Sequence, residues 1–355
     1  MLPLDFKGGA HMKYMGIDLH KQYLVATVMD EGGKILSKAR VPVERRAIGE
    51  YFRRVNGDGK LKAVMEACYN WGYLYDEIRD KVLEVKVAHP LRTRAIAEAR
   101  IKTDSIDSEV LAHLLRADLI PEAYAPEFET RDKKNLLRYR LSLVRTRVVF
   151  KNRVHAVLAR NHIEGYEFKR LSDKFGKRGR AYMRGLELRG NDTEILNNYL
   201  DLIEEIEGKI KEVDREISEV FREDEVCKLL KSIPGIGEFL AVLIRYEIDN
   251  IGRFASVGKL CSYAGLVPSV YSTGGRTYHG RITKQGNKWL RWGLTEAVQT
   301  AIAKDLWLKR YYDRVKQRGG ANKAKMAVAR KLLEIIYRVW KERRPYYEKS
   351  VAVAL

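Results

Sequence analysis

The chain is 355 residues long and 45% of its residues are hydrophobic, so it can form two or three folded domains and is not a disordered protein. No apolar run approaches the roughly 18 residues that a membrane-spanning helix needs, so we expect no membrane partner. The three cysteines (Cys68, Cys227 and Cys261) lie far apart, which excludes a disulfide framework and a Cys-x-x-Cys zinc site and fits a reducing cytoplasm. Lys and Arg number 67 against 47 Asp and Glu, a net charge of +20.

Most of this positive charge lies in the last third of the chain. Residues 251–355 contain 22 Lys and Arg against 6 Asp and Glu, a difference of +16. A segment of this kind attracts polyanions and releases their counterions on binding. We therefore expect a nucleic-acid-binding protein of the cytoplasm, associated with the nucleoid, rather than a protein with a generally basic surface.

The first third of the chain predicts an α/β domain. Residues 1–11 resemble an expression tag or an upstream extension, and we expect the folded domain to span residues 12–126. Amphipathic stretches predict helices around Ile48–Val55 and Tyr73–Val82. Apolar or alternating runs predict strands at residues 14–19, 23–29, 34–43, 61–66 and 85–88. Three antiparallel strands followed by alternating helices and strands indicate a mixed sheet.

Four carboxylates occupy positions where this pattern ends a strand or begins a helix. Asp18 lies inside an apolar strand and Glu66 ends another strand. Asp104 and Asp107 are three residues apart and share one face of a helix. Each acid has an ordinary explanation, as a solvent-facing strand end, an N-cap or a first-turn acid. Together they match the ligand layout of ribonuclease-H-like nucleases, whose carboxylates bind Mg²⁺ or Mn²⁺.

The middle of the chain, residues 127–228, predicts long helices. A basic helical pattern runs to about Asn161, residues 174–189 indicate a loop or a weak helix, and Asn191 begins a capping box. The apolar residues that follow alternate steps of three and four: Ile195, Tyr199, Leu202, Ile206, Ile210, Val213, Ile217 and Val220. This repeat predicts a coiled coil or a long helical hairpin, which we interpret as an oligomerisation region.

The C-terminal region, residues 229–349, is expected to be mainly helical. Ile233–Gly237 joins two apolar helical segments through a Pro-Gly-x-Gly turn that resembles a helix-hairpin-helix motif. In such a motif the backbone N–H groups of Gly235 and Gly237 would bind a DNA phosphate. The alternative is an ordinary tight turn between two helices.

Ser272 stands in the segment Tyr-Ser-Thr-Gly-Gly, which predicts a glycine-flanked loop. A serine at this place is either a turn hydroxyl that caps the backbone or a nucleophile. The histidines show no spacing typical of a metal site, although His279 is a candidate general base. Basic side chains that follow Ser272 in the sequence could neutralise a phosphate: Arg276, Arg281, Lys284, Lys288 and Arg291.

These motifs resemble those of the DEDD-type insertion-sequence transposases, relatives of the pilin-gene-inverting Piv recombinase. The N-terminal half of the resemblance rests on Met15–Lys21, Met65–Ala67, His89-Pro90 and Lys102–Ser108. The C-terminal half rests on Ile233–Gly237, Gly265–Pro268, Ser272–Gly275 and Ile282–Arg291. The resemblance spans about residues 13–345, with the motifs in the expected order in both halves.

The resemblance implies a RuvC-like domain, a coiled-coil linker and a serine-bearing transposase domain. The metal ligands would be Asp18, Glu66, Asp104 and Asp107, and Ser272 would form the phosphoserine link to DNA. A structured non-coding bridge RNA would pair with target and donor DNA, and the enzyme would work as a dimer or tetramer. Some relatives carry serine directly before the glycine, where this chain has Thr273, and Ser108 replaces a more usual alanine.

Two other functions fit the same residues. A metal-only RuvC-like junction resolvase would cut DNA by water attack and would not need Ser272. A non-enzymatic nucleic-acid-binding protein would use the helix-hairpin-helix motif and the coiled coil and would not need the four acids.

Overall fold

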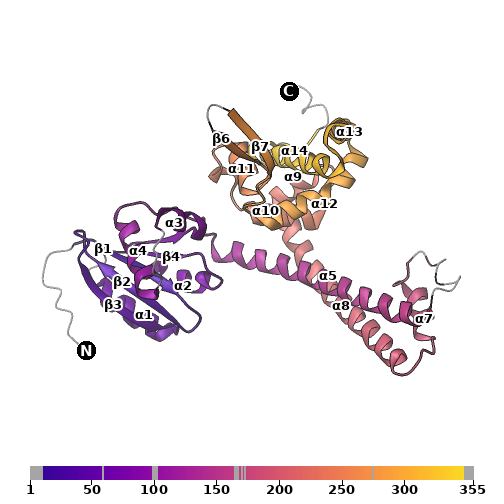
Figure 1. Ribbon diagram of the computed structural model, residues 1–355, viewed down its shortest axis with the longest axis horizontal. Helices are drawn as coiled ribbons and strands as arrows, with labels where there is room; N and C mark the ends of the chain where they lie inside the picture. The colour runs from indigo at the N-terminus through magenta and orange to yellow at the C-terminus, as the bar shows by residue number, and fades with distance from the viewer. Residues whose placement is uncertain are drawn as a thin grey trace. The chain divides into compact units, whose positions relative to one another are not determined.

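The computed structural model describes residues 11–57, 60–97, 103–163, 168, 171, 173–273 and 276–347, without the side chains of residues 271–277 and 279 (Figure 1). The chain divides into two compact units, Met1–Phe128 and Glu129–Leu355. Within the described residues, no helix combines the length and the apolar composition that crossing a membrane requires.

A mixed five-stranded sheet forms the centre of the N-terminal unit. Its strands are β1 (Lys13–Leu19), β2 (Tyr23–Met29), β3 (Ile35–Pro42), β4 (Leu61–Glu66) and β5 (Glu84–Ala88). The order is β3-β2-β1-β4-β5, with β1, β2 and β3 antiparallel and with β4 and β5 parallel to β1. The mixed sheet is confirmed, the strand ends differ from the predicted ones by no more than one residue, and the order is compatible with a RuvC-like domain.

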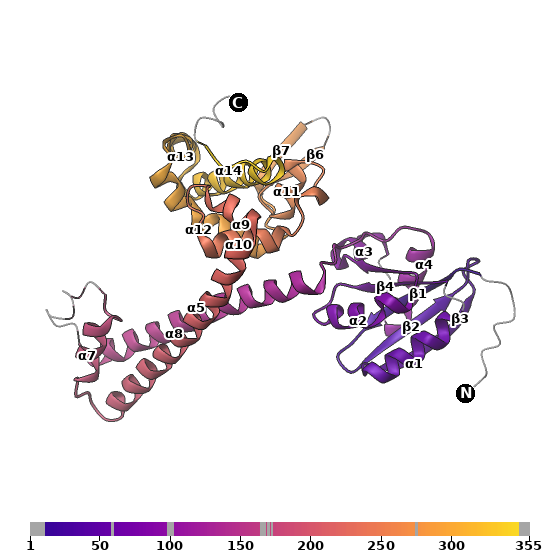
Figure 2. The same cartoon turned by 180° about the vertical axis from the view of Figure 1, so that it is seen from behind.

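Helices cover both faces of this sheet (Figures 1 and 2). They are α1 (Arg45–Asn56), α2 (Trp71–Ile78), the short η1 (Arg79–Lys81), α3 (Pro90–Ile96) and α4 (Asp104–Arg116). Helices α1 and α2 share a core with one face, in which Phe52 and Leu74 pack against Met15, Ile17 and Met65. Helix α4 packs on the other face, where Leu111 and Leu115 contact Val64 and Ala88.

The contact between α4 and the sheet is unusually close at Gly16. A Cβ atom on Gly16 would lie 2.0 Å from the carbonyl oxygen of Ser108 and 2.4 Å from the backbone nitrogen of Ala112. Beside this point the Ser108 hydroxyl is buried and lies 2.8 Å from the Thr27 hydroxyl of β2. The serine that replaces a more usual alanine at position 108 thus supplies a partner for the buried Thr27 hydroxyl.

We expect Gly16→Ala to destabilise the N-terminal unit. The new methyl group would overlap backbone atoms of α4, and overpacking of this kind costs roughly 1–3 kcal/mol or more. Chemical denaturation measures the loss. Gly49→Ala is the matched control, since it adds a methyl group inside α1 with nothing within 4 Å and should stabilise that helix. If the two variants were equally stable, the close contact at Gly16 would not restrict which residue the fold accepts at this position.

The second unit is mostly helical. Its elements are α5 (Phe128–Arg160), α7 (Lys177–Arg184), α8 (Asp192–Glu223), α9 (Glu225–Lys231), α10 (Glu238–Ile248), η2 (Ile251–Arg253), α11 (Val257–Tyr263), β6 (Pro268–Thr273), β7 (Arg276–Ile282), α12 (Lys288–Lys304), α13 (Leu306–Gly319) and α14 (Ala321–Glu342). Helices α9 to α14 share one large core, in which Leu243, Leu294 and Leu333 are fully buried. The mainly helical C-terminal region is confirmed, with a β6–β7 hairpin added to it.

Helices α5 and α8 form an antiparallel hairpin within the chain, with α7 near its tip (Figure 2). Arg140 of α5 pairs with Asp214 of α8 at 2.9 Å, and the Nε of Arg160 pairs with Asp192 at 2.8 Å. A later residue of α5 thus pairs with an earlier residue of α8, which shows that the two helices run antiparallel. The predicted start of α8 is confirmed, but the capping box is wrong, because Asn191 makes no side-chain cap bond.

The apolar stripe of α8 is shifted by one residue in its first turns. The buried residues are Leu196, Leu200, Ile203, Ile206, Ile210, Val213, Ile217 and Phe221. The first three pack at the hairpin tip against residues of α5 and against Met183 of α7, whereas Leu202, which the repeat placed in the seam, is 38% exposed. Much of the stripe thus forms intrachain core rather than a free seam.

A fully buried carboxylate joins three helices of the second unit. Glu247 of α10 accepts two hydrogen bonds from Arg138 of α5, both 3.0 Å long, and one of 2.8 Å from Asn287. Asn287 also caps α12, because its Oδ1 accepts from the N–H groups of Trp289 and Leu290. Arg138 is partly exposed, but its loss would leave the fully buried Glu247 carboxylate with less compensation, so this network holds α5 to the C-terminal core.

Lys134 of α5 is buried near this network, and burial lowers its pKa to about 8. The pKa of Lys134 in the unfolded chain is about 10.4, so between these two pKa values the unfolded chain binds more protons than the folded chain. We therefore expect the free energy of unfolding to rise with pH from about 8 to about 10. Lys134→Met should be more stable than the wild type at neutral pH and should lose this rise. Denaturation at several pH values tests this, with the exposed Lys211→Met as control.

Candidate active site

The start of helix α4 places Asp104 at the edge of the sheet. Thr103 is the N-cap of this helix, and its hydroxyl accepts from the Ile106 N–H at 3.3 Å. The alternative in which Asp104 itself caps the helix is therefore wrong. As the first helical residue, Asp104 directs its carboxylate to the end of β1 instead.

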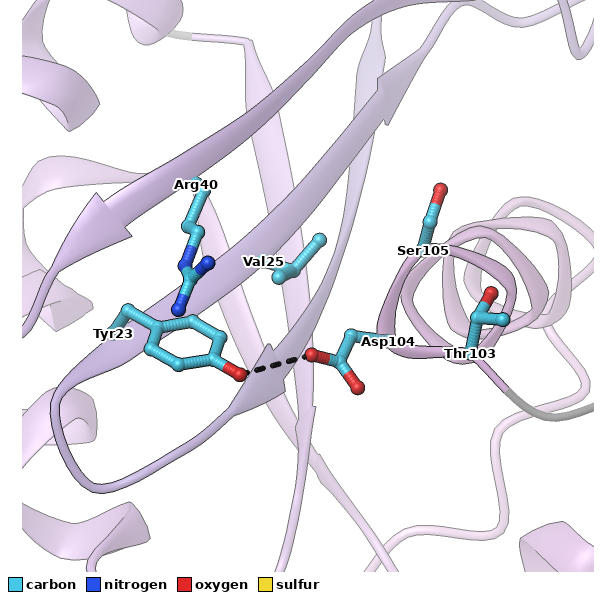
Figure 3. Close-up of a pocket in the computed structure, with 6 residues that line it drawn as sticks. All are labelled: Tyr23, Val25, Arg40, Thr103, Asp104 and Ser105. Carbon is cyan, nitrogen blue, oxygen red and sulfur yellow. Dashed lines mark hydrogen bonds between the residues drawn. The ribbon is translucent and has the colours of Figure 1, made fainter.

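Asp18, His20 and Asp104 come together at this edge. Nε2 of His20 lies 3.1 Å from Oδ2 of Asp18 and 3.1 Å from Oδ2 of Asp104. One potential ligand atom from each of the three residues lies within 4.8 Å of the others. The Tyr23 hydroxyl also donates to Oδ2 of Asp104 at 3.1 Å (Figure 3). We call Asp18, His20 and Asp104 the carboxylate cluster.

The other two predicted acids lie next to this cluster. The parallel pairing of β1 with β4 places Ile17 opposite Met65, so Glu66 is the neighbour of Asp18 at the carboxyl ends of these strands, and it is exposed. Asp107 lies on α4 after Asp104, and its charge acts on Asp18. Among the residues that the structure describes, the group with metal-like geometry contains His20 but neither Glu66 nor Asp107.

Three residues of this site were missed from the sequence: His20, Tyr23 and Arg40. The histidines show no metal-like spacing in the sequence, and His20 joins the cluster through Asp104, which is far away in the sequence. Strand alternation could have found the others. Val25 pairs with both Asp18 and Arg40, so Arg40 and Tyr23 emerge on the face of the sheet that carries Asp18.

The electrostatics of the cluster favour a divalent cation. Burial raises the pKa of Asp18, the His20 ring opposes this rise, and the charges of Asp104 and Asp107 raise the pKa again. The protein therefore holds carboxylates together without balancing their charge completely. Carboxylate oxygens suit hard divalent cations and an imidazole nitrogen suits transition-metal ions, so the residues present fit a divalent metal without selecting one ion.

Ser272 lies in the second unit, on strand β6 rather than in a loop. It pairs with Thr277 of β7, and Thr273 pairs with Arg276, so the loop prediction is wrong for this serine and its neighbour. Gly274 and Gly275 lie outside the described residues, as does Lys102 of the N-terminal motif.

Three of the predicted phosphate ligands are exposed, namely Arg281, Lys284 and Lys288. Arg291 instead has an internal partner, because its guanidinium donates to the Ala264 carbonyl at 2.8 Å, and burial lowers its pKa. The structure describes only the backbone of Arg276, in β7.

The Pro-Gly-x-Gly turn joins α9 to α10 as predicted. Gly235 has a φ of +87°, and a Cβ on it would lie 2.4 Å from the Ala297 carbonyl oxygen of α12. The positive φ and the packing against α12 therefore explain why position 235 requires glycine. Gly237, the N-cap of α10, has nothing within 4 Å of the corresponding position and is the more open of the two glycines.

Both halves of the chain match models of transposases. Residues 15–163 match the DEDD transposase model of IS110-type elements, and residues 227–313 match the model described as "Transposase IS116/IS110/IS902 family". The transposase for insertion sequence element IS1111A of Coxiella burnetii is 25% identical over 94% of this chain and 91% of its own length. A probable family 20 transposase of Pseudomonas aeruginosa is 23% identical over 92% and 96%. The pilin gene-inverting protein of Moraxella bovis is 33% identical over 33% of this chain and 38% of its own length.

A mixed sheet with an acidic cluster at its edge, matched by a DEDD transposase model, defines an enzyme that cleaves and transfers DNA strands. The chain belongs to the IS110/IS116 family of insertion-sequence transposases. The resemblance noted from the sequence motifs is therefore confirmed, and a non-enzymatic binding protein is excluded.

We expect Asp18→Asn to raise the metal-free melting temperature and to reduce the stabilisation by Mg²⁺. The substitution removes a partly buried charge that Asp104 and Asp107 repel, and it removes a ligand at the same time. For the wild type, a cation at 100 times its Kd would stabilise the fold by about 2.7 kcal/mol. Thermal melting with and without Mg²⁺ measures both effects. Asp80→Asn, whose side chain is 89% exposed in the same unit, should leave both values unchanged.

Proposed function

We propose that the chain is an RNA-guided DNA transposase that excises and inserts its mobile element through a phosphoserine intermediate at Ser272. The observation that carries the proposal is the meeting of Asp18 and Asp104 at one edge of the sheet, within the segment that matches the DEDD transposase model. Asp18, Glu66, Asp104 and Asp107 would hold Mg²⁺ or Mn²⁺. When bound, the ion stabilises the negative charge that develops on a phosphodiester.

Each residue near the cluster has a separate task in this proposal. Asp18 and Asp104 would hold a cation from β1 and α4, and through that cation they would position the reacting phosphate. The Tyr23 hydroxyl orients Asp104, and the same carboxylate raises the pKa of the tyrosine, so the phenol remains a hydrogen-bond donor. The turn that carries His20 is fastened by Asn70, whose amide donates to the His20 carbonyl at 3.1 Å.

Ser272 attacks the DNA phosphate from the end of the β6–β7 hairpin. Its hydroxyl forms the new ester bond to phosphorus, its proton passes to a base, and the DNA hydroxyl leaves. Exposed Arg281, Lys284 and Lys288 supply positive charge near this hairpin in the sequence. In this assignment the RuvC-like domain spans residues 12–126, the helical region 127–228 and the serine-bearing domain 229–349.

The partners follow from the same assignment. The names of the relatives, transposases of insertion elements and a pilin gene-inverting protein, support target and donor DNA as substrates. The net charge of +20 supports a structured bridge RNA as a further polyanionic ligand in the nucleoid. A homodimer or tetramer would bring one subunit's acids to another's serine. The α9–α10 turn would act as a helix-hairpin-helix, and α5 and α8 would supply a coiled coil.

A denaturing gel tests the proposal. The protein is mixed with Mg²⁺, DNA that carries the element ends and the target, and RNA transcribed from the flanks of the element. We expect a covalent protein–DNA adduct that forms only when the RNA is present. Ser272→Ala should abolish the adduct, and Asp104→Asn should reduce its formation by at least about 100-fold, the scale on which electrostatic stabilisation acts.

The remaining outcomes separate the alternatives. An adduct that survives Ser272→Ala and disappears in Thr273→Ala moves the nucleophile by one residue. Cleavage without any adduct, retained in Ser272→Ala, supports the metal-only resolvase and refutes the phosphoserine step. An adduct that forms equally well without RNA refutes the proposal that RNA guides the enzyme.

A further inference from the structure

We propose that Arg40 binds a backbone phosphate of the DNA strand that reaches the carboxylate cluster, and that Tyr23 holds Arg40 in place for this task. The inference rests on the proposed function and adds a substrate-positioning residue to it. Arg40 is separate from the four DEDD acids, and it lies over the ring of Tyr23, whose hydroxyl points to Asp104 (Figure 3).

Tyr23 makes two contacts of different kinds. The guanidinium carbon of Arg40 lies 3.6 Å from the centre of the Tyr23 ring, which is the geometry of a cation–π contact. The hydroxyl of the same tyrosine donates to Asp104. Tyr23 therefore contacts a cation with its ring and a carboxylate with its hydroxyl, and so links Arg40 to the carboxylate cluster.

The guanidinium of Arg40 is available to a ligand. Within the described part of the chain it makes no hydrogen bond and no ion pair, and the residue is exposed. The nearby Lys38 differs, since its ammonium group contacts Ser105 at 3.0 Å and Glu109 at 2.7 Å. Arg40 thus presents up to five N–H donors in a planar fork, the geometry that matches two phosphate oxygens.

An open pocket of about 480 Å³ connects this fork with the cluster. Its lining consists of Tyr23, Val25, Arg40, Thr103, Asp104 and Ser105. The lining therefore carries both the guanidinium of Arg40 and a carboxylate of the cluster (Figure 3). A phosphodiester strand that lies in this pocket can place one phosphate against Arg40, while another would reach a cation held by Asp104. An isolated small anion would gain only the first of these contacts.

The test compares full-length variants for affinity and turnover. Binding of the element-end DNA is measured over a range of salt concentrations in Ca²⁺, and adduct formation is measured in Mg²⁺ as a function of DNA concentration. Arg40→Gln should lower the magnitude of the slope of log K against log salt by about 0.9, the value for one duplex phosphate, or about 0.7 on a single strand. It should raise the half-saturating DNA concentration more than it lowers the maximal rate.

Matched variants distinguish positioning from folding. Arg40→Lys should keep the salt slope but recover the half-saturating concentration only in part, because an ammonium group cannot form the fork. Tyr23→Phe keeps the ring beneath Arg40 and should keep the slope, while turnover falls because Asp104 loses its donor. Arg53→Gln removes an exposed arginine from α1, on the opposite face of the sheet, and should change nothing.

The inference fails if Arg40→Gln binds the DNA with the wild-type slope and the wild-type half-saturating concentration. It also fails if Arg40→Gln lowers the melting temperature and Arg40→Lys does not restore binding, since that result assigns Arg40 a structural role. Absence of any adduct in the wild type would refute the proposed function alone, because the salt slope of binding still reports on Arg40.

Discussion

The close approach of α4 to Gly16 is the constraint on which the candidate site depends. A helix normally rests on a sheet through side chains, but here the backbone of Ser108 and Ala112 comes within the space that a Cβ on Gly16 would need. The Thr27–Ser108 hydroxyl pair fixes the helix at the same place. This depth brings the first turn of α4 to the end of β1, so that His20 can contact both Asp18 and Asp104. A glycine with no chemistry of its own thereby sets the size of the carboxylate cluster.

A second buried interaction plays the corresponding part in the helical unit. Glu247 unites Arg138 of α5 with Asn287 at the start of α12. The segment from Ile282 to Arg291 suggests nucleic-acid binding from its charge, but Asn287 and Arg291 face the protein. Only part of that segment, including the exposed Lys284 and Lys288, is left for a ligand. The same short motif therefore combines folding and binding roles.

Much of the sheet could be predicted because alternation and apolar runs report directly on strands that are buried on one or both faces. The phase of a long amphipathic helix is harder to predict. In α8, Ile195 and Leu196 are equally apolar, and packing at the hairpin tip rather than local pattern decides that Leu196 is buried. Thr103 and Asp104 are likewise both good N-caps, and the backbone geometry selects Thr103. His20 was beyond prediction because the fold supplies its partner from a residue 84 positions later.

The packing of Gly235 on α12 has a consequence for the way in which DNA would be held. The turn before α10 touches α12 at Ala297, and Lys288 is the first residue of that same helix. Nine residues separate the two points, which corresponds to about 14 Å along a helix axis at about 1.5 Å per residue. A strand that touched both the turn and Lys288 would meet two contacts at a distance that the helix fixes. Helix α12 would then act as a ruler that sets the spacing of the bound backbone.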